Sequence, residues 1–167
     1  MRNNIFFLKR TAWTFCTVAF SIAIHGQNTA QITEVPFTQV QIQDAFWSPR
    51  IETNRTVSIP SAFRECEKNG RFDNFAIAGG LKEGEHRGDF SFDDTDPYKI
   101  IEGASYSLAV KYDARLDAYL DSVIALIAAA QESDGYLTTC VTNRCTRLSG
   151  WWGTHRWEKI NIHELYN

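Results

Sequence analysis

The amino-acid sequence predicts an all-α fold of helical hairpins, and two amphipathic segments joined by a short connector carry that prediction. The first opens with Asp96 and Pro97, residue types that favour the cap and first turn of a helix, and extends to Tyr112. The second covers residues 114–132, where apolar side chains recur at helical spacing. The connector at Asp113 is short, so we expect the two helices to pair antiparallel. Successive hairpins of this kind build helical toroids.

The second of these helices combines an apolar face with a run of three small residues. Residues 128–130 are all alanine, which lets another helix approach closely. Gly135 is expected to end the helix, because glycine readily takes the left-handed conformation that many helix ends need. The polar groups around it can bind a sugar, although they fit a helix cap or the edge of a core equally well: Gln131, Asp134 and Tyr136. The face itself comprises Leu116, Tyr119, Leu120, Val123, Ile124, Leu126, Ile127 and Ala130.

Upstream of the hairpin, the sequence indicates a short strand and two further helices. Residues 40–44 alternate apolar and polar side chains, as an edge strand would. The Ser-Pro pair at 48–49 favours the start of a helix, which Pro60 is expected to interrupt before it resumes and reaches Lys68. A second, shorter helix over residues 72–78 is then expected between glycines.

The start of the chain has the pattern of a secretory signal. Residues 1–26 begin with basic side chains, continue with an uncharged apolar run over 11–24, and end at a small residue, Gly26. The run is short for a membrane span, although a retained anchor is the alternative. We therefore expect a secreted or periplasmic protein, in which residues 27–39 form a leader and residues 40–167 form the domain.

Composition and charge exclude several classes of partner. A chain of 167 residues, 44% hydrophobic and 13% aromatic, can build a real core and is not typical of disorder. Removal of the signal takes three basic and no acidic residues with it, which moves the formal net charge from −3 to −6. Such a protein offers no attraction for nucleic acid or for an anionic membrane. The oligomeric state is left open.

Three cysteines remain after that removal: Cys66, Cys140 and Cys145. In an exported protein, Cys140 and Cys145 can pair across their short loop. Cys66 lies within a predicted helix and is expected to be buried. Neither the spacing nor the neighbouring histidines match a known zinc pattern, so the sequence predicts no metal site here.

Residues 88–96 hold four aspartates and two phenylalanines. They fit a pair of catalytic carboxylates or, for Asp96, a helix cap at the positive end of the helix dipole. A calcium loop is excluded, because the glycine of that motif is absent. Phe92 beside Asp94 is the most suggestive pair, since an aromatic face next to a hydrogen-bond acceptor can hold a sugar ring.

Histidines supply one further candidate. His163 and Glu164 form only part of the zinc-protease motif, because the second histidine would stand at position 167, which is Asn167. A histidine at the start of a helix can still donate a hydrogen bond to a sugar hydroxyl. His86 and His155 are expected at the surface.

The chain carries several short motifs in order: FWSP at 46–49, FDDTDPYK at 92–99, EGASY at 102–106, AQESDGYL at 130–137 and HELY at 163–166. Together they resemble the N-terminal part of glycoside hydrolase family 127, the β-L-arabinofuranosidase-like family. The resemblance extends from about residue 40 to residue 167. It implies an (α/α)6 toroid with the active site at one mouth of the ring, and this chain would form a truncated part of that ring.

The resemblance also implies a chemistry. Members of the family are retaining exo-enzymes on furanosides, with a cysteine nucleophile in a zinc site of one glutamate and three cysteines, and a further glutamate as acid/base. Those residues lie past the end of this sequence, so neither catalytic residues nor zinc is expected in this chain. By position, His163 matches a sugar-contacting histidine, and Phe92 and Asp94 match residues that line the pocket. Ile162 departs from the small polar residue usual before that histidine.

The leading hypothesis is a fragment of an exported glycosidase whose substrate is a furanoside-containing carbohydrate. One alternative is a carbohydrate-binding remnant without catalytic activity. Another is a different (α/α)6 enzyme, either a glycosidase or a lyase.

Overall fold

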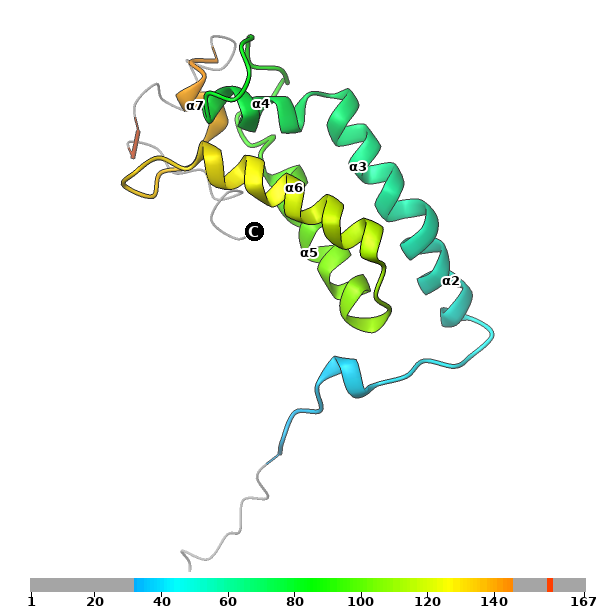
Figure 1. Cartoon of the computed structure of the whole chain (residues 1–167). Coiled ribbons are helices and arrows are strands. Elements are labelled where there is room, and N and C mark those ends of the chain that lie inside the picture. The colour runs from blue at the N-terminus through cyan, green and yellow to red at the C-terminus, as the bar shows by residue number, and fades with distance from the viewer. Residues whose placement is uncertain (1–31, 146–155, 158–167) are drawn as a thin grey trace, which may run out of the picture. The chain divides into compact units, whose positions relative to one another are not determined.

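The computed structural model describes residues 32–145 and 156–157 of the chain. Two compact units divide the sequence, Met1–Phe37 and Thr38–Asn167, and every helix that begins after Gln39 belongs to the second. All regular elements in the described ranges are helical, which confirms the predicted all-α class (Figure 1). In chain order they are the 3-10 helix η1 (Phe37–Gln39), α2 (Trp47–Thr53), the π-helix η2 (Asn54–Ser58), α3 (Ile59–Lys68), α4 (Arg71–Ala78), α5 (Thr95–Val110), α6 (Ala114–Ala130) and α7 (Thr139–Thr142).

The strand predicted at residues 40–44 is not formed. This segment is irregular and ends in a turn, and the described residues contain no strand with which it could pair. Its polar groups instead organise the start of α2: Asp44 Oδ1 accepts a hydrogen bond from the backbone N–H of Phe46 (2.7 Å), and Ser48 Oγ donates to the carbonyl of Ile42 (3.0 Å). The segment therefore leads into a helix.

Pro60 does not break the first helix but widens it. In an α-helix, the proline ring would clash with the carbonyl of Thr56, and the missing N–H could not bond to it. The turn before Pro60 is η2, in which the N–H of Ile59 donates to Asn54 across five residues. As a result α2, η2 and α3 run on continuously to Lys68, and Gly70, with a left-handed φ of +75°, follows the end of the helix.

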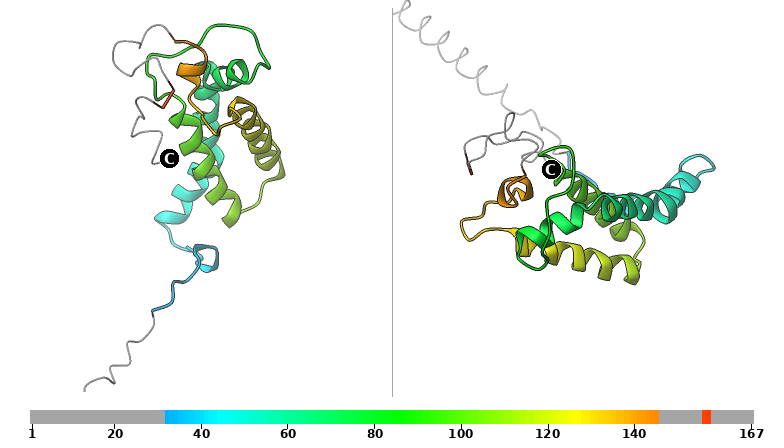
Figure 2. Two further views of the ribbon diagram at one scale, coloured as in Figure 1. Left: turned by 90° about the vertical axis from the view of Figure 1, so that its left-hand side faces the viewer. Right: turned by 90° about the horizontal axis from the view of Figure 1, so that it is seen from above.

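The predicted hairpin is present: α5 and α6 run antiparallel in both Figure 1 and Figure 2. Asp113 caps α6, because its Oδ1 accepts hydrogen bonds from the N–H groups of Arg115 (3.0 Å) and Leu116 (3.3 Å). The expected end of α6 was wrong, since the helix stops at Ala130. Gly135 lies in a later turn with a φ of +89°.

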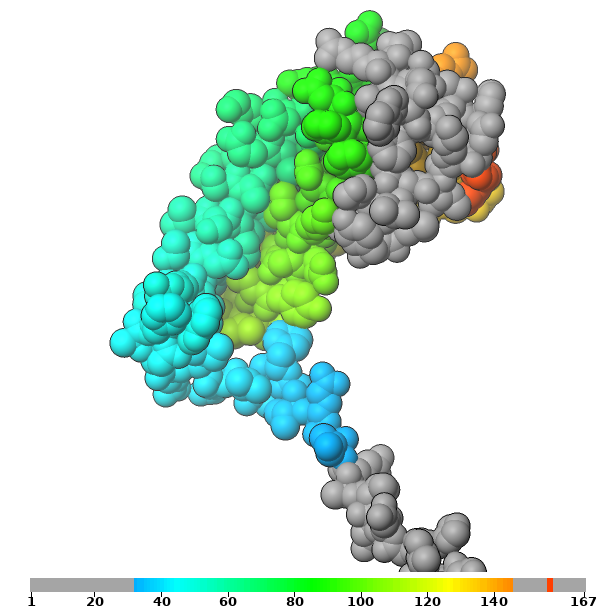
Figure 3. Space-filling view, turned by 180° about the vertical axis from the view of Figure 1, so that it is seen from behind, coloured from blue at the N-terminus to red at the C-terminus, as the bar shows by residue number. Residues whose placement is uncertain are grey.

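The core lies where α3, α5 and α6 meet, with Phe72 added from α4. Figure 3 shows α3 and α5 side by side on one face of this unit. The predicted small-residue contact also forms, because Gly79, just after α4, packs against Ala129 of α6. On α6, Ile124 was expected on the apolar face but is exposed. The buried side chains are Ile59, Phe63, Cys66, Phe72, Ala104, Leu120 and Val123.

Within the described ranges, no helix combines the length and the apolarity that a membrane crossing requires. The expected signal over residues 1–26 and the expected surface residue His155 lie outside the residues that the structure describes.

Candidate functional site

The acidic segment of residues 88–96 connects α4 to α5, and the structure gives its aspartates different environments. Asp93 and Asp94 are almost fully buried, with 3% and 2% of their surface exposed, whereas Asp96 is exposed. Buried carboxylates need partners, because desolvation of a charge is costly. The partners of these two lie on different elements, and they decide how the segment is held.

Asp94 connects the start of α5 to the start of α7. Its Oδ2 accepts a hydrogen bond from the backbone N–H of Thr139 (2.7 Å), and its Oδ1 accepts one from Thr139 Oγ1 (2.6 Å). Burial raises the pKa of Asp94 to about 6, although the two hydrogen bonds from Thr139 act in the opposite direction. Asp96, the predicted cap, lies inside the first turn, because α5 begins one residue earlier, at Thr95.

Arg71, the first residue of α4, holds two of the other aspartates. Its guanidinium lies 2.9 Å from Asp93 Oδ1 and 3.1 Å from Asp96 Oδ2. Burial raises the pKa of Asp93, and the charge of Arg71 opposes that rise. Gly88 permits this arrangement, because a side chain at its φ of +129° would begin 2.1 Å from Asp93 Oδ2. The segment therefore folds around Arg71.

An open pocket of about 250 Å³ lies beside this ion pair. Phe90 is 53% exposed and stacks on Phe92, with ring centroids 5.1 Å apart and planes 20° apart. An aromatic face next to charged and amide groups suits a polyhydroxylated ligand such as a sugar. The described residues of the pocket offer binding groups but no nucleophile paired with a base. They are Asn69, Arg71, Arg87, Gly88, Asp89 and Phe90.

The sugar-binding residues predicted from the sequence lie as follows. Phe92 is half-buried against Phe90, and Asp94 is directed at Thr139, so neither is among the described residues that line the pocket. His163 lies outside the described residues. Contact of these three with substrate stays a prediction. Sequence reasoning missed Phe90, although its spacing of two from Phe92 is a signal that could have indicated it.

The pocket cations were missed for a different reason. Arg71 and Arg87 lie in and after a helix that the sequence marks only by its apolar residues, and no local pattern links them to the aspartates. Their proximity to the acidic segment is a product of the tertiary fold.

The polar loop after α6, residues 131–138, contacts Arg156 and Trp157. Arg156 lies 3.1 Å from Glu132 Oε2 and also pairs with Asp134. Trp157 Nε1 donates to Asp134 Oδ2 (3.3 Å), and its ring meets the Tyr136 ring edge-on at 4.9 Å. These groups therefore join residues 156–157 to the loop.

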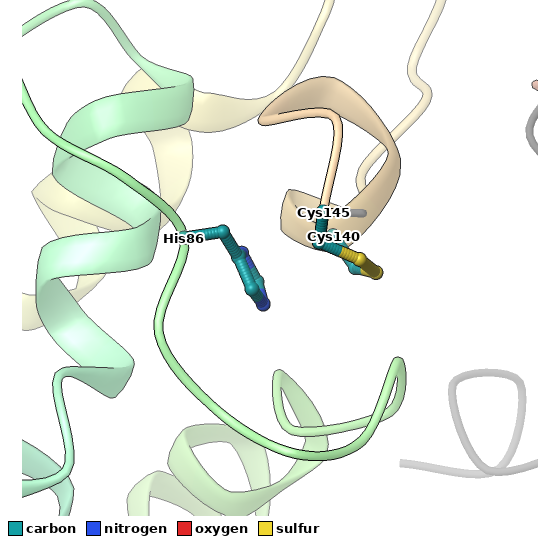
Figure 4. A group of neighbouring side chains, drawn as sticks. All are labelled: His86, Cys140 and Cys145. Carbon is teal, nitrogen blue, oxygen red and sulfur yellow. A yellow bond between two sulfur atoms is a disulfide. The ribbon is translucent and has the colours of Figure 1, made fainter. Parts of the chain in front are cut away.

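The cysteines occupy two separate environments. Cys140 and Cys145 form a disulfide, the pairing that the sequence left open. Cys66 is buried as predicted, and burial raises the pKa of its thiol to about 11, which leaves it unreactive. His86 was expected at the surface but is half-buried close to the disulfide, and burial lowers its pKa to about 4 (Figure 4).

Comparison with known proteins gives the same family from sequence and from structure. The family model described as β-L-arabinofuranosidase, GH127 catalytic domain, matches residues 39–167. A non-reducing end β-L-arabinofuranosidase of Bifidobacterium longum subsp. longum is 46% identical over 66 residues, which are 40% of this chain and 10% of that protein.

Two solved structures are also similar. A GH127 β-arabinofuranosidase superposes with a TM-score of 0.67 at 48% identity over 74% of this chain and 20% of its own. A GH127 β-L-arabinofuranosidase from Geobacillus stearothermophilus T6 gives a TM-score of 0.61 at 33% identity over 65% of this chain and 18% of its own.

These likenesses confirm the predicted fold class, helical hairpins that are part of an (α/α)6 toroid. The chain spans about a tenth of the curated relative and about a fifth of the solved structures. By its match to the catalytic-domain model over most of its length, the chain belongs to glycoside hydrolase family 127, the β-L-arabinofuranosidase family.

Proposed function

We propose that this chain is the N-terminal segment of an exported glycosidase that releases β-L-arabinofuranose from carbohydrate chains. The observation that carries the proposal is the family match over residues 39–167. The pocket beside Arg71 and the stacked Phe90 and Phe92 rings support it, because they offer an aromatic face and hydrogen-bonding groups to a sugar. In this proposal, the segment binds and orients substrate.

The zinc site that the family resemblance implies does not fit the described residues. That site needs one glutamate and three cysteines together, whereas here Cys140 and Cys145 are joined and Cys66 is buried in the helical core. No step of the proposed reaction therefore runs through a metal held by these residues. The bond-breaking groups belong, in this proposal, to a part of the enzyme outside this segment.

The proposal is tested by comparing two proteins, the 167-residue chain and the product of the full reading frame that encodes it. We expect the longer protein to release arabinose from p-nitrophenyl β-L-arabinofuranoside, and the 167-residue chain to release none. In the longer protein, Phe90→Ala and Phe92→Ala should each weaken catalysis, because each removes one of the two stacked rings that offer an aromatic face to the sugar. Leu137→Ala, outside the pocket, is the matched control. Failure of the longer protein to cleave any arabinofuranoside would overturn the proposal.

Export is the second part of the proposal, and it is supported by the basic start, the apolar run and the polar return at Gln27. N-terminal sequencing of the protein recovered outside the cytoplasm should begin near Gln27. A cytosolic protein that still begins at Met1 would contradict export, and it would leave the proposed reaction untested.

A further inference from the structure

One cluster of chemically capable side chains plays no part in the proposed function. His86, Cys140 and Cys145 each present a ligand atom, and these atoms all lie within 4.8 Å of one another (Figure 4). Imidazole nitrogen and cysteine sulfur are the ligands that zinc prefers, and in a tetrahedral site they lie roughly 3.5–4 Å apart. The imidazole therefore lies near the spacing that such a site needs, whereas the sulfurs of Cys140 and Cys145 are bonded to each other and must move apart after reduction to reach it.

The segments that carry the three residues are fixed to one another through Asn74, which is fully buried in α4. Asn74 Nδ2 donates to the carbonyl of Arg87 (2.7 Å), and the N–H of Arg87 donates to Asn74 Oδ1 (2.8 Å). Asn143 Nδ2 donates to the Asn74 carbonyl (2.9 Å) from the turn between the two cysteines. Because neighbours of all three residues are bonded to Asn74, the cluster depends on a rigid scaffold rather than on a mobile loop.

The imidazole of His86 supplies an independent observation. Its Nε2 lies 3.5 Å from Asn74 Nδ2, whereas Nδ1 is buried and has no hydrogen-bond partner among the described residues. A buried polar atom without a partner is costly, and such atoms often mark a site for an ion or a water. Nδ1 is thus the ring nitrogen that is available to a ligand.

We propose that His86, Cys140 and Cys145 form a redox-gated site for a thiophilic divalent cation of the zinc class. In the oxidised chain, the disulfide ties up both sulfurs and excludes the metal. A phosphine reductant attacks one sulfur and water then attacks phosphorus, so the S–S bond breaks and the products are two thiols and the phosphine oxide. Binding of the cation displaces one proton from each thiol.

His86 completes the coordination without a net change in its charge. It coordinates as the neutral imidazole, with its proton on Nε2 and the Nδ1 lone pair on the metal, so Nε2 accepts no hydrogen bond from Asn74 Nδ2 in the bound state. Three protein ligands leave one tetrahedral position for water. This ligand set differs from that of the zinc site that the family resemblance implies, so the inference does not depend on the proposed glycosidase reaction.

The test uses Co(II) as a spectroscopic probe on the 167-residue chain in which Cys16 and Cys66 are changed to Ala. Only Cys140 and Cys145 then remain, and circular dichroism checks that each variant keeps its helices. After reduction with a water-soluble phosphine, we expect the chain to bind one Co(II) ion. Its spectrum should show thiolate charge-transfer bands and the visible bands of tetrahedral Co(II), and added zinc should displace the ion. The oxidised chain should show neither band.

Two variants assign the ligands. Cys145 is half-buried, and Cys145→Ser should abolish the charge-transfer bands that two thiolates give. His86→Gln should remove the tetrahedral visible bands and leave the helices intact. His155→Gln is the matched control and should behave as the parent. The proposal is overturned if the reduced parent binds no Co(II), or if His86→Gln binds it with unchanged spectra.

Discussion

The α5–α6 hairpin and the acidic segment of residues 88–96 are held in opposite ways. The hairpin depends on apolar side chains at helical spacing and on a local cap, Asp113, whose partners are the next residues of the chain. The acidic segment depends on buried charges whose partners are remote, such as Asp94 and Thr139, which are 45 residues apart. Local patterns therefore determine where the helices form, while remote polar partners determine the shape of the site.

The largest expected effect breaks the hairpin. Val123 is 2% exposed in the middle of α6, so Val123→Pro removes a helical hydrogen bond and disturbs the core around it. We expect a loss of about 3 kcal/mol or more in the free energy of unfolding, measured by urea denaturation. The neighbouring Ile124 is 46% exposed, and Ile124→Ala should cost far less. Equal losses at both positions would contradict the assigned buried face.

The next effect concerns the buried carboxylate and depends on pH. Asp94 has a pKa of about 6 in the folded chain against an ordinary value of 3.8, so between these values the folded state binds more protons than the unfolded state. Its contribution to stability is therefore present at low pH and declines as the pH rises from about 4 to about 6. Relative to Asp94→Asn, the wild type should lose on the order of 2–3 kcal/mol over that range.

Urea denaturation at a series of pH values measures this difference. Asp121→Asn, at an exposed position of α6, provides the reference for a carboxylate outside the buried segment. The prediction is that the wild type loses stability relative to Asp94→Asn as the pH rises. A difference that stays constant, or that changes in favour of the wild type, would contradict it.

The smallest effect tests the close approach of α4 to α6. A Cβ on Gly79 would lie 2.9 Å from the backbone of Ala129, so Gly79→Ala should destabilise the chain by about 1 kcal/mol or more. Gly103 lies within α5 and has open space at its Cβ, so Gly103→Ala should stabilise the chain by about 0.5–1 kcal/mol. Thermal unfolding of the two variants should show shifts of opposite sign. A stabilising Gly79→Ala would show that the contact is looser than described.

The sequence predicted the hairpin correctly because its signals are local. Apolar spacing placed Leu120 and Val123 in the core, and the alanine run anticipated the packing of Gly79 on Ala129. Two predictions from local patterns were wrong. Residues 40–44 form no strand, because the described residues contain no strand to pair with them, and α6 ends at Ala130 and not at Gly135.

The candidate site was less predictable for a physical reason. A carboxylate at a helix start can serve as a cap, contact a ligand or bond to another element, and residue type alone does not distinguish these roles. Asp94 bonds to Thr139, and Arg71 gathers Asp93 and Asp96, because the fold brings these remote positions together. The same holds for His86, which reaches the disulfide only through the scaffold around Asn74.

The most direct test of this comparison is amide hydrogen exchange at Thr139, whose N–H donates to buried Asp94. In the wild type, we expect the amides of Thr139 and of Val123 in the hairpin both to exchange slowly. In Asp94→Ala, we expect protection at Thr139 to collapse while Val123 stays protected, because only the remote polar partner has been removed. Unchanged protection at Thr139, or loss of protection at both amides together, would contradict the account.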